Sequence, residues 1–206
     1  REANTVSVIS NASVVKTIML DRLPFALAYD RSDRDMYVTN NAGTVFVING
    51  TSSSLIGNIQ VGGASSDLLG IAYNPSDQRM YVTSYSDDRV YIMDSSQVRG
   101  SLGGFDAPIG ISFNASTSEM FVVNSGNDTV GASWKGASSI VLVGPDPREV
   151  VFEPSVGRGD SRRRLRGENA VGRRRLTPSC RFLDRAHLSI FICTFAEASI
   201  PSRAYR

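Results

Sequence analysis

The residue types that carry out most enzyme chemistry are missing from the first three quarters of this 206-residue chain. Residues 1–156 contain no cysteine and no histidine, because Cys180, Cys193 and His187 all come later. Thiol nucleophiles, imidazole acid–base catalysis and imidazole metal ligands are therefore excluded from this part of the chain. We assign no catalytic residues.

Carboxylates remain, and they concentrate in two short segments. Asp30, Asp33 and Asp35 lie in one, and Asp87 and Asp88 lie in the other. Oxygen ligands of this kind suit Ca²⁺. The spacing is not that of an EF-hand loop, and aspartates favour β-turns because their side chains accept hydrogen bonds from nearby backbone N–H groups. We therefore expect turn chemistry in both segments, with Ca²⁺ as the one cofactor to consider and no metal site assigned.

These acidic segments belong to a repeat. Residues 70–84 form two apolar, β-branched runs joined by an Asn-Pro-Ser-Asp sequence, which predicts two strands and a tight turn. The same pattern recurs around Met36, Met80 and Met120, which are 44 and 40 residues apart. A repeat of this length indicates one structural unit used several times.

Two further strands follow each pair. Third strands are expected at 43–49, 88–94 and 128–132, and fourth strands at 13–20, 55–61, 98–102 and 139–143. Four short strands in roughly 40–45 residues are typical of a β-propeller blade. The predicted fold class is all-β: a partial β-propeller with a half blade at 1–21, full blades at 22–62, 63–104 and 105–144, and one further first strand at 148–153. The chain is expected to begin in mid-blade and to form an arc of a larger ring.

The second strands also resemble a known family. Met-Tyr-Val-Thr-Asn at 36–40 and Met-Tyr-Val-Thr-Ser at 80–84 look like the YVTN-type β-propeller repeat, whereas Phe-Val-Val-Asn at 121–124 departs from it. The resemblance covers about residues 1–156. It implies a propeller of the kind found in secreted and surface-layer proteins of archaea and bacteria, and it carries no catalytic residue set.

The composition changes after residue 156. Residues 157–206 contain twelve arginines, no lysine and four acidic residues, a net charge of +8, whereas residues 1–156 carry −6. The repeat also breaks off near 154–160. We expect a tail that is disordered or translated out of frame, with a genuine unrelated tail and a diverged blade as the alternatives.

Several motifs in this tail invite a functional interpretation. Arg-Gly-Asp at 158–160 is short enough to occur by chance, and the arginine runs at 162–164 and 173–175 would bind anions only nonspecifically, if the tail is real. Cys180 and Cys193 lack the spacing of a zinc site, but a disulfide is conceivable in an oxidising compartment. The apolar run at 188–196 is too short to cross a membrane and is expected to form a strand.

Loops at one end of the propeller are the candidate binding site. With the first strand innermost, this end carries the loops between strands two and three and those between blades. The candidate contact residues are Asn40, Asn41, Asp67, Tyr85, Asp87, Asp88, Asp106, Asn127 and Asp128. Four sequons add possible glycosylation at Asn11, Asn49, Asn114 and Asn127. By contrast, Tyr29, Tyr37, Tyr73, Tyr81 and Tyr91 recur at strand positions and are expected between blades.

The function expected from these features is that of a non-catalytic binding or structural module, extracellular or at the cell surface. Its partner would be a protein or a glycan, and no transmembrane segment or signal peptide is recognised in the sequence. One alternative is a lactonase-like or dehydrogenase-subunit propeller whose active residues lie in further blades. A second alternative is a nucleic-acid-binding propeller, which the charge of −6 on residues 1–156 opposes.

Overall fold

The computed structural model describes residues 4–115, 118–134, 137–142, 147–152, 179–185 and 188–194. Within these ranges the chain forms strands joined by turns, and no helix occurs. Strand pairs are antiparallel throughout. The described part of the chain is therefore all-β.

Three four-stranded sheets repeat the same meander, in which neighbours in sequence are neighbours in the sheet. Blade 1 contains β3 (Pro24–Tyr29), β4 (Asp35–Asn40), β5 (Thr44–Asn49) and β6 (Ser54–Gln60). Blade 2 contains β7 (Leu68–Asn74), β8 (Arg79–Ser84), β9 (Arg89–Met93) and β10 (Val98–Leu102). Blade 3 contains β11 (Pro108–Asn114), β12 (Glu119–Asn124), β13 (Thr129–Trp134) and β14 (Ala137–Leu142).

Two smaller sheets flank these blades. Before blade 1, β1 (Thr5–Ser10) pairs with β2 (Ser13–Met19), which is the expected half blade. After blade 3, β15 (Pro147–Phe152), β17 (Leu188–Thr194) and β16 (Ser179–Arg185) form a sheet in that order.

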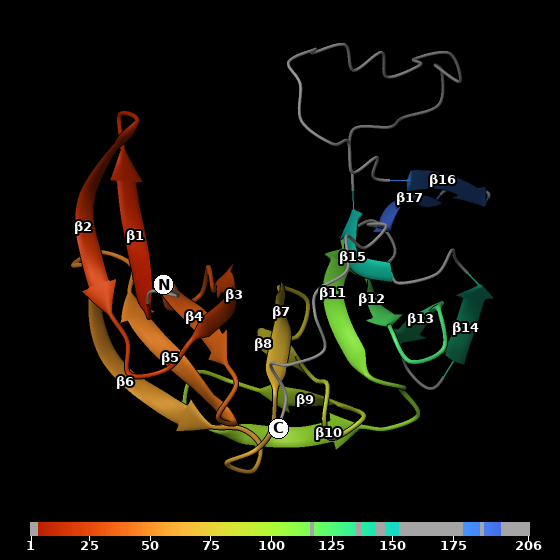
Figure 1. Ribbon diagram of the computed structural model, residues 1–206, viewed down its shortest axis with the longest axis horizontal. Helices are drawn as coiled ribbons and strands as arrows, with labels where there is room; N and C mark the ends of the chain where they lie inside the picture. The colour runs from red at the N-terminus through yellow and green to blue at the C-terminus, as the bar shows by residue number, and fades with distance from the viewer. Residues whose placement is uncertain are drawn as a thin grey trace, which may run out of the picture.

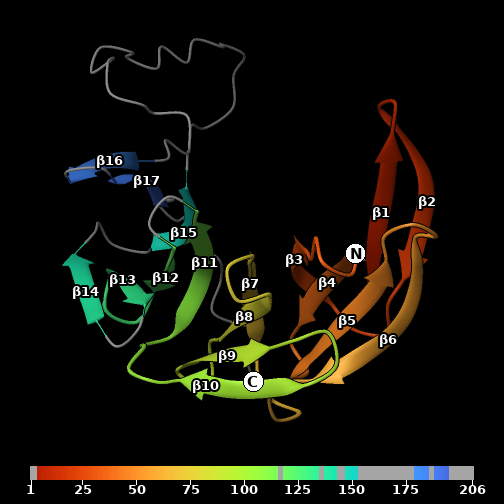
Figure 2. The same ribbon diagram turned by 180° about the vertical axis from the view of Figure 1, so that it is seen from behind.

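The five sheets follow one another around an open arc (Figures 1 and 2). The first strands β3, β7, β11 and β15 lie on the inside of the arc and contact one another in sequence, whereas β6 and β10 lie on the outside. This arrangement confirms the predicted fold class, a partial β-propeller, and its blades agree closely with the predicted ones.

The expected tail is described only at β16 and β17. Both segments are strands, so the disorder expected for residues 157–206 is not found there, and β17 lies within the run 188–196 that was expected to form a strand. The Arg-Gly-Asp sequence, both arginine runs and His187 lie outside the described residues. The proposed change of reading frame remains a prediction.

The hydrophobic core consists of layers between successive blades. Ile71 and Tyr73 pack against Tyr37 and Val45 of blade 1, whereas Ala72 faces the other way and packs between blades 2 and 3. This alternation follows from the two-residue period of a strand, which lets each strand contribute to two layers. Each blade therefore depends on both of its neighbours for burial of its apolar residues.

A threonine of the second strand joins blade 2 to blade 3. The first strand of blade 2 carries a bulge, in which Leu69 and Gly70 lie opposite Thr83. The Thr83 hydroxyl accepts a hydrogen bond from the Gly70 N–H (2.7 Å) and donates one to the Ile109 carbonyl of blade 3 (2.7 Å). The hydroxyl thus satisfies the backbone group that the bulge leaves out of the ladder.

The same two hydrogen bonds occur in blade 1 but not in blade 3. Thr39 accepts a hydrogen bond from the Ala26 N–H (3.0 Å) and donates to the Leu69 carbonyl (3.3 Å). In blade 3 the position belongs to Val123, which has no hydroxyl. We call the interaction of Thr39 or Thr83 with the following blade the threonine link.

Tyrosines of the second strands fix the turn that precedes them. The Tyr37 hydroxyl donates to Asp33 (2.6 Å) and the Tyr81 hydroxyl donates to Asp77 (2.7 Å). Burial, together with the aspartate that accepts the hydrogen bond, raises the pKa of Tyr81 to about 12 and raises that of Tyr37 as well. Both are inter-blade core residues, as expected. The expectation is wrong for Tyr29, which is 45% exposed because no described strand covers it.

Candidate functional site

The turns between strands two and three and the loops between blades lie at one end of the propeller, because successive strands alternate in direction. We call this end the rim and define it as residues 40–43, 61–67, 85–88, 103–107 and 125–128. It contains all nine of the predicted contact residues. The structure shows how these loops are held to one another.

Gly43 holds the first part of the rim together. Its N–H donates to the Ser66 carbonyl (2.9 Å), and its own carbonyl accepts from the N–H groups of Val61 (2.8 Å) and Gly62 (2.9 Å). Gly43 has a positive φ of 71°, and a Cβ atom there would lie 1.9 Å from the Gly63 carbonyl oxygen. Only glycine allows this close approach of turn and loop.

Asp87 holds the second part of the rim together. One oxygen of its carboxylate, Oδ2, accepts hydrogen bonds from the hydroxyls of Ser66 (2.6 Å), Ser84 (2.7 Å) and Tyr91 (3.0 Å). Burial alone would raise the pKa of Asp87, but these three donors outweigh it and lower the pKa below its ordinary value. The carboxylate is thus ionised and ties the loop between blades 1 and 2 to blade 2.

Backbone hydrogen bonds extend the connection to the neighbouring loops. The Tyr85 N–H donates to the Asp67 carbonyl (2.9 Å), and the Asp67 N–H donates to the Ser86 hydroxyl (3.0 Å). Farther along, Asp88 accepts a hydrogen bond from the Ala107 N–H (2.8 Å). The loops of blades 1 and 2 therefore form a continuous network.

In the third part of the rim, hydrogen bonds again join a turn to the neighbouring loop between blades. Ser125 donates to the Ala107 carbonyl through its N–H (3.1 Å) and its hydroxyl (2.7 Å). The Gly126 N–H donates to the Asp106 carbonyl (3.1 Å), and the Asn127 side chain accepts from the Thr129 hydroxyl (2.6 Å). Loops of three blades are thus joined without a break.

The predicted contact residues divide into two groups. Asn40 is fully buried and bonds within its own turn, so its prediction as a contact residue is wrong. Asp87 is half-buried and binds three hydroxyls, which makes it part of the support rather than of the contact surface. Asp67 and Asp128 are half-buried as well. The exposed members are Asn41, Tyr85, Asp88, Asp106 and Asn127.

Sequence reasoning missed the serines that organise the rim. Ser66 is buried and donates to Asp87, and Ser86 accepts from Asp67. The signal available in the sequence was the run Gly-Gly-Ala-Ser-Ser-Asp at 62–67, in which small residues allow close backbone approach and hydroxyls supply donors.

The rim is acidic. Its loops contain the five aspartates Asp67, Asp87, Asp88, Asp106 and Asp128 and no lysine or arginine. The exposed aromatic ring of Tyr85, 44% accessible, lies among them in sequence. Such a surface would repel anions and suits a partner with positive charge or with many hydroxyl groups.

The acidic turns at the opposite end have a structural role. Asp30 accepts from the N–H (2.7 Å) and hydroxyl (2.6 Å) of Ser32, and Asp35 accepts from the Asn49 side chain (3.0 Å) and the Gly50 N–H (3.2 Å). No group of three or more His, Cys, Asp or Glu side chains within the described ranges is placed to hold a metal ion.

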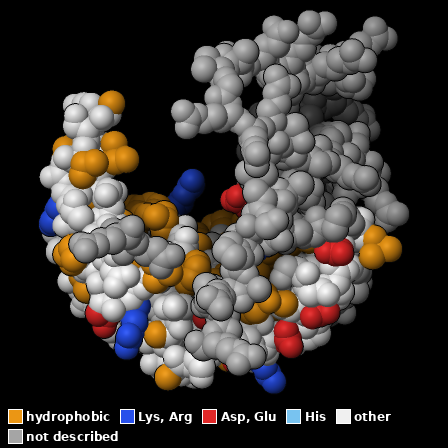
Figure 3. Space-filling view, in the orientation of Figure 1, with side chains coloured by type: hydrophobic (Ala, Val, Ile, Leu, Met, Phe, Trp, Pro, Cys, Tyr) orange, Lys and Arg blue, Asp and Glu red, His pale blue; other side chains and the backbone are white. Residues whose placement is uncertain are grey.

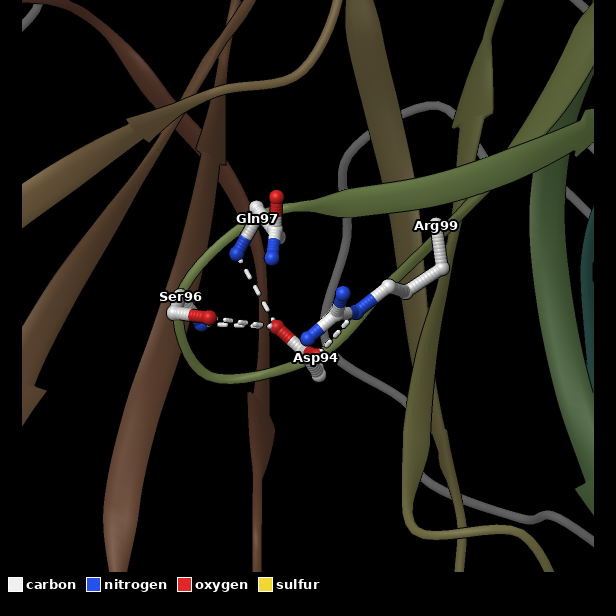
Figure 4. Close-up of polar contacts among 4 residues, drawn as sticks. All are labelled: Asp94, Ser96, Gln97 and Arg99. Carbon is white, nitrogen blue, oxygen red and sulfur yellow. Dashed lines mark hydrogen bonds and ion pairs between the residues drawn. The ribbon is translucent and has the colours of Figure 1, made fainter.

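Asp94 in the turn between β9 and β10 illustrates this role (Figure 4). Its carboxylate accepts from the N–H and hydroxyl of Ser96 and from the Gln97 N–H, and it forms an ion pair with Arg99. Burial alone would raise the pKa of Asp94, but the Ser96 N–H and the Arg99 side chain hold it well below its usual range. The arrangement closes the turn.

The four sequons lie in different environments. Asn114 is 0% exposed, so a glycan cannot be accommodated there in this fold and that prediction is wrong. The Asn49 amide donates to Asp35 (3.0 Å) within its turn. Asn127 is exposed on the rim, and Asn11 is exposed at the tip of the β1–β2 hairpin, so both stay predictions.

Comparisons with known proteins bear on the fold class. Neither a family model nor a curated protein matches this chain. Among solved structures, 667 chains match. One of them is Kuenenia stuttgartiensis hydrazine synthase, with a TM-score of 0.55 and 20% identity over 71% of this chain and 43% of that chain.

The sheets and this likeness define the chain as a β-propeller protein. The chain spans less than half the length of the hydrazine synthase chain, and at 20% identity the likeness shows the fold alone. In the part of the chain that the structure describes, no helix has the length and apolar character needed to cross a bilayer.

Proposed function

We propose that this chain is a non-catalytic binding module that presents its rim to a partner outside the cell or on the cell surface. The observation that carries the proposal is the hydrogen-bonded network joining the loops of three blades, which leaves Asn41, Tyr85 and Asp88 exposed on a fixed support. Loops held in one conformation lose little entropy on binding, so this support favours recognition.

The chemistry of the rim narrows the partner to a protein with a basic surface or to a glycan. Carboxylates, amides and a tyrosine ring are the groups that bind ammonium and guanidinium ions or sugar hydroxyls. A nucleic acid would meet an acidic surface and be repelled. The absence of Cys and His from residues 1–156 is in keeping with a binding role.

The extracellular setting rests on the resemblance of the second strands to YVTN-type repeats. Met-Tyr-Val-Thr at 36–39 and 80–83 carries that resemblance, and the repeat is known from secreted and surface-layer proteins. The exposed sequons at Asn11 and Asn127 fit the same setting.

A binding experiment with two matched variants tests the proposal. The full chain is applied to an array of microbial surface polysaccharides and to immobilised poly-L-lysine, which represents a basic polypeptide. A rim variant, Asn41→Ala with Tyr85→Ala, is compared with a variant of the opposite end, Ser76→Ala with Ser95→Ala, all four positions being exposed. Binding that only the rim variant loses supports the proposal, whereas binding that both variants retain places the contact elsewhere.

A further inference from the structure

Asn49 and Gly50, at the turn between β5 and β6, form the only Asn-Gly sequence of the chain. In such a sequence the glycine nitrogen can attack the asparagine side chain, because glycine has no side chain of its own to hinder the approach. Asn49 is half-buried and Gly50 is exposed, so water reaches this turn. The turn lies at the end of the propeller opposite the rim, so it is separate from the proposed binding site.

One carboxylate oxygen contacts both nitrogens that would take part in this reaction. Oδ1 of Asp35 accepts a hydrogen bond from the side-chain nitrogen Nδ2 of Asn49 (3.0 Å) and another from the Gly50 N–H (3.2 Å). Asp35 lies opposite Asn49 in the register of β4 and β5, which fixes this arrangement. A base that contacts the attacking nitrogen and the leaving nitrogen can take a proton from the first and return it to the second.

The side-chain oxygen of Asn49 lies among three hydrogen-bond donors. It accepts from the N–H groups of Thr51 (3.2 Å) and Ser52 (2.8 Å) and from the Ser52 hydroxyl (2.9 Å). Attack on the amide carbon Cγ places negative charge on this oxygen. Donors that already point at the atom where charge develops lower the barrier of such a reaction. The turn therefore supplies a base and a set of donors for the same step.

Blade 2 shows that the product of the reaction fits this turn. Asp94 holds there the position that Asn49 holds in blade 1. Its Oδ1 accepts from the Ser96 N–H (3.0 Å), the Ser96 hydroxyl (2.9 Å) and the Gln97 N–H (3.0 Å), as Figure 4 shows. Burial alone would raise the pKa of Asp94, but the Ser96 N–H and Arg99 outweigh it and stabilise the charged form.

We propose that Asn49 is a self-modification site, at which the chain converts this asparagine through a succinimide to aspartate or isoaspartate. The Gly50 nitrogen forms a bond to Cγ of Asn49, and the bond between Cγ and Nδ2 breaks. Asp35 takes the proton of the Gly50 N–H and returns it to the leaving nitrogen, which departs as ammonia. Water then opens the succinimide ring.

The reaction changes the charge of blade 1. Arg79 holds in blade 2 the position of Asp35, so Asp94 lies opposite a residue of opposite charge. An aspartate at position 49 would instead lie opposite Asp35, and like charges destabilise a cross-strand pair. Figure 3 shows that uncharged side chains and backbone cover most of the blades on that face, so one added carboxylate is a large relative change. The modification therefore marks the chain and weakens this turn.

Mass spectrometry of the full chain during incubation at neutral pH tests the proposal. We expect loss of ammonia at Asn49, about tenfold or more faster than in a peptide of residues 46–54, which lacks Asp35. Asn41, which is exposed and followed by alanine, is the internal reference and should convert much more slowly. Asp35→Asn keeps an oxygen acceptor but is a far weaker base, so it should slow the conversion about tenfold or more.

A second variant keeps the test independent of the folding of Asp35→Asn, which circular dichroism checks. Ser52→Ala removes one donor to the Asn49 side-chain oxygen at an exposed position, and it should slow the conversion about threefold or more. The proposal is overturned if Asn49 converts no faster in the folded chain than in the peptide. It is also overturned if Ser52→Ala, or a folded Asp35→Asn, converts at the rate of the unaltered chain.

The stability of a product variant tests the consequence for blade 1. Asn49→Asp should have a lower midpoint temperature than the unaltered chain, because two carboxylates then lie opposite each other. Adding Asp35→Asn to this variant removes the like charges and should recover most of the loss. An Asn49→Asp variant as stable as the unaltered chain would show that the modification does not weaken the turn.

Discussion

Removing the hydroxyl of Thr83 should loosen the junction between blades 2 and 3. Thr83→Val keeps the shape of the side chain but deletes two hydrogen bonds of 2.7 Å at a position that is 0% exposed. A buried N–H left without a partner costs about 1–3 kcal/mol, and the second lost bond adds about 0.5–1.5 kcal/mol. The free energy of unfolding should therefore fall by about 2–4 kcal/mol.

Urea unfolding followed by far-ultraviolet circular dichroism measures the effect. With a slope of about 2 kcal/mol per molar urea, the midpoint should fall by about 1–2 M. Thr83→Ser is the control, since it keeps the hydroxyl and loses one methyl group, worth about 1 kcal/mol. Thr39→Val should lower the free energy of unfolding less than Thr83→Val does, because the hydrogen bonds of the Thr39 hydroxyl are longer, 3.0 and 3.3 Å. If Thr83→Val were as stable as Thr83→Ser, the threonine link would contribute nothing and our reasoning would fail.

Three further predictions concern the rim and the last sheet. The folded pKa of Asp87 is lowered from an ordinary value of 3.8, so its ionised form stabilises the fold above that pH, and this contribution is lost as pH falls through the folded pKa. The midpoint temperature of Asp87→Asn should therefore be lower than that of the unaltered chain at pH 7, and it should change less between pH 5 and about 2. A variant whose midpoint changes with pH as much as that of the unaltered chain would argue against the role of Asp87. Gly43→Ala should unfold at a lower temperature than the unaltered chain, because its Cβ would lie 1.9 Å from the Gly63 carbonyl oxygen; equal midpoints would show that the rim adapts. Cys180 lies opposite Cys193 in the register of β16 and β17, so mass spectrometry after mild oxidation should find a disulfide between them, and two free thiols would refute this prediction.

The sequence predicted the strands and blades well because each is a local pattern repeated along the chain. Alternation around Met36, Met80 and Met120 places the second strands, and the turn residues between them place the boundaries. The position of Thr83 within its strand could be predicted in the same way. Its acceptor could not, because the Ile109 carbonyl belongs to a bulge 26 residues away.

The candidate site was predicted less completely, for a related reason. The loops were correctly placed at one end, but neighbouring residues in a loop differ in role: Asp87 supports the rim and Asp88 is exposed. Which of two adjacent aspartates faces inward depends on where Ser66, 21 residues earlier, places its hydroxyl. Burial of Asn114 likewise depends on residues outside its own strand, so the sequon alone could not exclude it.

The uneven distribution of the threonine links affects where unfolding of the chain begins. Blades 1 and 2 each donate such a bond to the next blade, but Val123 gives blade 3 none. Stability in a repeat protein is a sum of unit terms and nearest-neighbour terms, so the weakest neighbour term sets where separation begins. Within the described residues the threonine links join blades 1, 2 and 3, whereas neither the junction of blade 1 with the β1–β2 sheet nor that of blade 3 with the sheet that begins with β15 has one. We therefore expect the chain to open first at one of these two outer junctions, at a free energy below that of global unfolding.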